Sequence, residues 1–176
     1  MQEAITAERE LTHSWYDRFN RGETLFRAAK TPVELPKADI DPASTSLDPK
    51  KIDEALGQKG EMSKGVYKVT IGRTTKMGDT EVGNTMGVNT WAAFGGSDDN
   101  AVVDGDFAVA ESELQPVLKS LRSGGINVVA IHHHMSGESP RILFLHYWGR
   151  GKAIDLAGTI RKALDFTAWD GKTKSS

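Results

Sequence analysis

The chain has 176 residues, 38% of them hydrophobic, and a formal net charge of −2 at pH 7. This length suits one domain with a real core plus a short extension, and the charge indicates neither nucleic acid nor an anionic membrane as a partner. Because the chain contains no cysteine, disulfides, iron–sulfur clusters and thiol catalysis are excluded. No run of residues predicts a membrane span, and the first residues do not form the pattern of a secretory signal peptide.

The N-terminal part differs in composition from the rest. Residues 1–30 mix charges of both signs with loosely helical apolar spacing, which predicts a helical arm. Residues 31–47 contain three prolines and a small polar run, so we expect a linker or an extended wrapping segment. A domain is then predicted over residues 48–168, followed by a flexible tail over residues 169–176.

The first half of this domain predicts a helix and then strands. Asp48 can cap the helix and Gly57 can end it. Residues 74–85 are polar and contain glycine, which is typical of a loop or an irregular hairpin. Alternating side chains predict three strands, over residues 66–71, 88–94 and 101–110.

The second half predicts a helix, two strands and a last helix. The buried side of this last helix is predicted to consist of Ala153, Leu156, Ala157, Ile160 and Leu164. Ser112 and Gln115 fit a capping box at the start of the first helix. The strands over 126–135 and 141–148 are apolar on both faces, so we expect their hairpin in the centre of the sheet. The element order indicates an α+β fold: a mostly antiparallel sheet with helices on one face, a split βαβ arrangement near its end, and the N-terminal arm.

Four of the five histidines lie between positions 132 and 146, on these last two strands. Alternation places His132 and His134 on one face of their strand and His133 on the other. If His132 lies directly opposite His146, all three imidazoles share one face, whereas a shift of one residue would move His146 to the other. Three imidazoles on one face predict a transition-metal site, because imidazole is a common ligand of such ions.

Further polar and aromatic residues complete the candidate site. Glu138, in the turn, could act as a fourth ligand or as a general base. Asp106 could orient a metal-bound imidazole as an acceptor, or could be an ordinary charged strand end. Trp91 and Trp148 are candidates for a ligand pocket or for aromatic core, and Arg150 for anion binding or for a turn before the last helix.

Several segments between residues 47 and 166 resemble the LppY/LpqO family, also called DUF1259. They are residues 65–73, 91–94, 105–106, 123–126, 132–135, 140–141, 146 and 149–151. This is a bacterial family of often exported or lipid-anchored proteins with no settled activity, so the resemblance implies a periplasmic or extracellular location. The family's histidines match His132, His134 and His146, while His133 stands where asparagine is usual. Members often carry two such domains, which leaves open whether a partner subunit supplies a second one.

Three functions remain open at this point. The first is a metal-binding protein of the bacterial cell envelope, with copper or zinc favoured and iron or nickel compatible with the same ligands. The second is a metal-dependent enzyme with Glu138 as general base. The third is a metal-free binding module for a small molecule or glycan. The expected partners are therefore a small molecule and, in the case of a homo-oligomer, a second copy of the chain.

Overall fold

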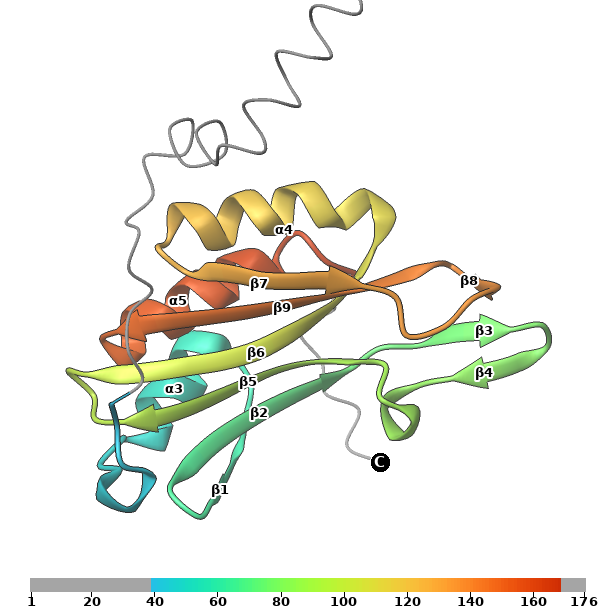
Figure 1. Cartoon of the computed structure of the whole chain (residues 1–176). Coiled ribbons are helices and arrows are strands. Elements are labelled where there is room, and N and C mark those ends of the chain that lie inside the picture. The colour runs from blue at the N-terminus through green and yellow to red at the C-terminus, as the bar shows by residue number, and fades with distance from the viewer. Residues whose placement is uncertain (1–38, 169–176) are drawn as a thin grey trace, which may run out of the picture. The chain divides into compact units, whose positions relative to one another are not determined.

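A six-stranded antiparallel sheet lies at the centre of the structure, a computed structural model that describes residues 39–168 (Figure 1). Its strands, in spatial order, are β1 (Glu61–Ser63), β2 (Val66–Gly72), β5 (Asn89–Gly96), β6 (Ala101–Ala110), β9 (Ile142–Gly151) and β7 (Asn127–His132). A three-stranded sheet extends from one end, at the right of Figure 1. It contains β4 (Thr80–Val82), β3 (Thr75–Met77) and β8 (Glu138–Ser139). The predicted α+β class and antiparallel sheet are confirmed.

Three helices pack on one face of the larger sheet. They are α3 (Pro49–Leu56), α4 (Glu111–Ser123) and α5 (Ala153–Leu164), and two short 3-10 turns are η1 (Pro42–Ser44) and η2 (Asn84–Met86). All three helices contribute buried residues to one hydrophobic core. None of the helices in the described part of the chain is long and apolar enough to cross a membrane.

The ends of the helices show where neighbouring residues in the sequence were enough to predict the structure. The Asp48 carboxylate accepts a hydrogen bond from the Lys50 backbone N–H at 3.1 Å, and Gly57 ends α3 with φ of 70°. Both were predicted, because each signal depends only on near neighbours. The capping box predicted at Ser112 is wrong. Helix α4 follows β6 directly at Glu111, and the Glu113 carboxylate accepts the Ala110 N–H at 2.8 Å.

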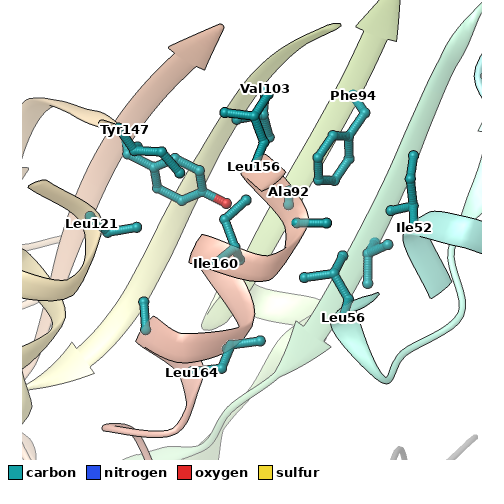
Figure 2. Packing of buried hydrophobic residues seen from close by; sticks show 14 of the residues in the cluster. Ile52, Leu56, Ala92, Phe94, Val103, Leu121, Tyr147, Leu156, Ile160 and Leu164 are labelled. Carbon is teal, nitrogen blue, oxygen red and sulfur yellow. The ribbon is translucent and has the colours of Figure 1, made fainter. Parts of the chain in front are cut away.

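The core lies between the helices and one face of the sheet. Figure 2 shows Leu156, Ile160 and Leu164 along α5, directed at the strands, and all three are buried as predicted. On β6, Gly105 leaves room for a neighbouring ring: a Cβ there would lie 2.2 Å from Tyr147 ring atoms. The Tyr147 hydroxyl donates to the backbone oxygen of Trp91 at 3.0 Å, which satisfies its polar group inside the core.

The last strands form the expected split βαβ unit, but not in the expected place. β6 and β7, joined by α4, both pair antiparallel with β9, which lies between them. β7 is therefore an edge strand, and the predicted central position of the hairpin is wrong. Its Val129 and Ile131 side chains are 66% and 42% exposed. The apolar residues on both faces of β7 led to the wrong prediction of a central strand. An edge strand has no neighbouring strand on one side, so some of its apolar side chains can remain exposed.

The predicted arm over residues 1–30, residues 31–38 of the linker and the tail over 169–176 lie outside the described residues. Residues 39–47 of the predicted linker lie against the domain. The Ser46 N–H donates to the Gly96 oxygen at 2.8 Å, and Leu47 is buried. This part of the chain therefore lies along the sheet as a wrapping segment, which was one of the two expectations for residues 31–47.

Candidate functional site

The candidate site lies on the face of the six-stranded sheet turned away from the helices, which we call the site face. Strand pairing fixes which residues belong to it. Asp106 on β6 lies opposite Trp91 on β5 and opposite His146 on β9. In the next row, Asp104 lies opposite Trp148. Alternate residues of these same strands point into the core, so the site face and the core are built from the same segments.

His132 and His146 meet on this face without being paired directly. His132 lies opposite Phe144, and Ala130 lies opposite His146, so the register differs by two positions from a direct pairing of the two histidines. A shift of two positions keeps a side chain on its own face, and the Nε2 atoms of His132 and His146 are 2.8 Å apart. A β-bulge between Val128 and Ala130 shifts the register within β7, and the connection from β7 to β9 includes β8, which pairs with β3.

His134 follows the end of β7 and joins the same group through ring stacking. Its ring lies on the buried Phe144 ring, with centroids 3.5 Å apart, and 5.0 Å from the His132 ring. Partial burial and then the His132 charge lower the pKa of His134, while the Asp106 charge opposes this change. The sequence analysis missed Phe144 as a support for His134. The signal was available, since Phe144 stands two residues before His146 and therefore on the same face.

Asp106 is the carboxylate of this group. Its residue is only 4% exposed, and its Oδ2 lies 4.0 Å from His146 Nε2. Its Oδ1 is buried and has no hydrogen-bond partner among the described residues. Burial raises the pKa of Asp106, and nearby positive charge on His146, His134 and His132 works in the opposite direction.

Glu138 and His133 belong to the turn rather than to this group. Glu138 lies opposite Met77 in the small sheet, and its Oε1 accepts the Ile142 N–H at 3.3 Å, while its buried Oε2 has no partner in the described part of the chain. Its own backbone N–H, the Ile142 N–H and the charges of Arg141 and His133 lower its pKa. His133 Nδ1 lies 3.2 Å from the Ile142 oxygen.

The three predicted pocket residues lie on the site face at different distances from the histidines. Trp91 is next to Asp106, and the Lys68 ammonium lies 4.3 Å from the centre of its ring. Trp148 is half-buried, one row further along β9 than His146. Arg150 lies another row away, and it bonds Asn100 Oδ1 at 3.0 Å and Asp39 Oδ1 at 2.5 Å. Arg150 thus holds the strand end and the segment before α3.

The histidines and Asp106 are of the residue types that bind transition metals, but the distances between them are not those of a metal site. Among residues 39–168, no three His, Asp or Glu side chains are arranged to hold a metal ion as they stand. Two nitrogens bound to one tetrahedral ion at 2.0–2.1 Å would be about 3.3 Å apart. The 2.8 Å between His132 and His146 is therefore a hydrogen-bond distance, which would have to open by about 0.5 Å. The His132 and His146 side chains are both partly exposed, which leaves room for such an adjustment.

Comparison with known proteins agrees with this organisation of the chain. A search of curated proteins and a search of solved structures found no match. A family model described as Domain of Unknown Function (DUF1259) matches residues 50–166, which include every described strand and all the residues of the candidate site. The chain therefore belongs to the DUF1259 family.

Proposed function

We propose that this domain binds a transition metal ion through His132, His134 and His146. The observation that carries the proposal is the 2.8 Å approach of the His132 and His146 Nε2 atoms beside a buried carboxylate. A hydrogen bond between two imidazoles would explain that distance alone. It would not explain why a third imidazole and an unpaired Asp106 oxygen gather there, since buried polar groups are normally satisfied.

The proposed role is carriage, sensing or buffering of the metal. Copper or zinc is the favoured ion, and iron or nickel is compatible with imidazole ligands. We also propose that the protein works in the bacterial cell envelope, in the periplasm or outside the cell. That part of the proposal is supported by the resemblance to exported members of the family. Fractionation of the producing cells tests it, and recovery in the cytosol would contradict it.

The proposal is tested by measuring the metal content of untagged protein purified without added metal. We expect close to one transition-metal ion per chain in the wild type, and loss of that metal in the His132→Ala/His134→Ala double variant. Circular dichroism and thermal unfolding of both proteins show whether the variant keeps its fold. A wild type that carries no metal and takes up none on titration with Zn²⁺ or Cu²⁺ would overturn the proposal.

A further inference from the structure

We infer that Asp106 is itself a metal ligand, so that the site is a set of three histidines and one carboxylate. We further infer that this set selects a divalent ion such as Zn²⁺ over Cu⁺. The inference rests on the proposed function and goes beyond it, because it assigns the fourth ligand and the class of ion. The sequence alone left two roles open for Asp106: an acceptor behind a metal-bound imidazole, or an ordinary charged strand end.

The first step is which nitrogen of His146 faces Asp106. An acceptor that only orients a metal-bound imidazole bonds the ring nitrogen on the side away from the metal. In this structure the nitrogen within 4.0 Å of Asp106 Oδ2 is Nε2, and the same Nε2 faces His132. Asp106 therefore lies on the side of the ring where the metal would bind, which is the position of a ligand.

The second step is the state of the carboxylate. Asp106 is 4% exposed, and its Oδ1 is buried without a partner in the described part of the chain. A buried carboxylate normally has hydrogen bonds, an ion pair or a metal, because removing its charge from water is costly. Its neighbours are the Leu145 backbone N–H and the imidazoles of His132, His134 and His146. A divalent cation held between these side chains would bind the Oδ1 atom that has no partner within residues 39–168.

The third step is spacing. An imidazole nitrogen and a carboxylate oxygen on one tetrahedral ion, each at 2.0–2.2 Å, would be about 3.4 Å apart. The observed 4.0 Å between His146 and Asp106 differs from this by about 0.6 Å. Side-chain rotation covers such a difference. Strand pairing already fixes Asp106 directly opposite His146, so no movement of the backbone is required.

Glu138 is the competing fourth ligand, and its surroundings differ. Its carboxylate accepts the Ile142 N–H, and its strand pairs with β3 in the small sheet. Asp106 lies directly opposite His146 on the site face, and its Oδ2 is 4.0 Å from His146 Nε2. Asp106 is thus the carboxylate that belongs to the histidine group.

The chemistry of the donors sets the class of ion. Thioether and thiolate sulfur favour Cu⁺, whereas imidazole with carboxylate suits divalent ions. The chain has no cysteine, and Met135 packs against a second hydrophobic cluster. That cluster is formed by Val82, Val88, Ala108, Ile142 and Phe144. The Met135 side chain is therefore engaged in packing, and the donors at the site are nitrogen and oxygen.

The test compares Asp106→Asn with Asp104→Asn, a matched control on the same strand and the same face. Zn²⁺ and Cu⁺ affinities are measured by competition with chromophoric chelators, the latter without oxygen. Loss of an acceptor behind a ligand typically costs about 10–100-fold in metal affinity. We expect Asp106→Asn to weaken Zn²⁺ binding by more than about 100-fold and Cu⁺ binding by less than about threefold. Asp104→Asn and Glu138→Gln should leave both affinities close to those of the wild type.

A spectroscopic readout separates a ligand from a positioning residue. Co²⁺ is bound in place of Zn²⁺, and its visible absorption reports the donor set. We expect Asp106→Asn to change the position and intensity of these bands. An unchanged Co²⁺ spectrum, or a Zn²⁺ affinity equal to that of Asp104→Asn, would overturn this inference alone. A wild type that binds none of the three ions would overturn the proposed function as well.

Discussion

The two faces of the six-stranded sheet are built from the same strands but differ in role. One face packs in the core, and the other carries the candidate site. On β6, Val103 and Phe107 point to the helices and are fully buried in apolar surroundings. Their neighbours Asp104 and Asp106 point to the other face, where Asp106 meets His146. Because successive side chains alternate, one strand can supply the core and the candidate site at once.

Two carboxylates show how the faces differ. Glu113, at the start of α4, bonds the Arg73 guanidinium through both oxygens and also accepts the backbone N–H groups of Ala110 and Ala168. Asp106 has one buried oxygen without any partner among the described residues. The comparison teaches that the saturated carboxylate is structural. The unsaturated one, Asp106, is the carboxylate on which the proposed metal site depends.

Substitutions of neighbouring residues on opposite faces should therefore have very different effects on the free energy of unfolding. Phe107 is 0% exposed and packs against Tyr147, with ring centroids 5.4 Å apart. We expect Phe107→Ala to lower the free energy of unfolding by about 3–5 kcal/mol, because it leaves a cavity in the core. Urea denaturation of the metal-free protein measures this change.

The matched variant for this measurement is Asp106→Asn, one residue away. We expect it to change the free energy of unfolding of the metal-free protein by less than about 1 kcal/mol, since it removes a buried charge without removing volume. A loss as large as that of Phe107→Ala would make Asp106 a structural residue and would erase the difference between the two faces.

The second prediction concerns the saturated carboxylate. Glu113→Gln leaves the Arg73 guanidinium, whose side chain is 18% exposed, beside a neutral partner. We expect a loss of about 2–3 kcal/mol in the free energy of unfolding. Glu111→Gln, an exposed position in the same helical turn, is the control and should cost less than about 0.5 kcal/mol. Equal effects of the two variants would contradict the structural role of Glu113.

The same pair predicts a pH dependence. Burial raises the pKa of Glu113, but the hydrogen bonds from Arg73 and the Ala110 N–H outweigh it, so the folded pKa lies below the ordinary 4.5. The stability that Glu113 contributes is therefore fully present above pH 4.5 and is lost as the pH falls through the lower folded pKa. In acid titrations followed by denaturation, Glu113→Gln should lose less stability over this range than the wild type.

Local signals in the sequence were sufficient for much of the fold. The α3 helix was predicted from its Asp48 cap and Gly57 end, and the strand over 101–110 from its alternating side chains. The buried side of α5 followed from helical spacing. Each of these features depends on residues that are close in sequence, so the pattern contains the information.

Features that depend on pairing between distant segments could not be predicted in the same way. The edge position of β7 follows from its having a partner only in β9. The pairing of β7 with β9 includes a β-bulge between Val128 and Ala130, and the connection between these strands forms β8, which pairs with β3 instead of making a tight turn. Whether the histidines share a face depends on this register, so the sequence left both arrangements open. The side of the His146 ring that faces Asp106 depends on side-chain rotation, which no spacing encodes.

The smallest expected effect separates the adjacent residues His133 and His134. His134 stacks on Phe144 within the histidine group, whereas His133 is exposed and its Nδ1 lies 3.2 Å from the Ile142 oxygen in the turn. We expect His133→Asn to change the free energy of unfolding by less than about 0.5 kcal/mol, because it removes a single part-buried hydrogen bond of an exposed residue. Metal stoichiometry should remain that of the wild type.

His134→Asn is the matched variant, with the same substitution one residue further along. It removes both a proposed imidazole ligand and a ring stacked on Phe144, so metal affinity measured by calorimetric titration should fall strongly while the sheet stays folded. Which of the two variants loses metal affinity decides whether the ligands lie on the site face. If His133→Asn lost the metal and His134→Asn kept it, the ligands would lie in the turn. Glu138 would then be the carboxylate next to the metal, in place of Asp106.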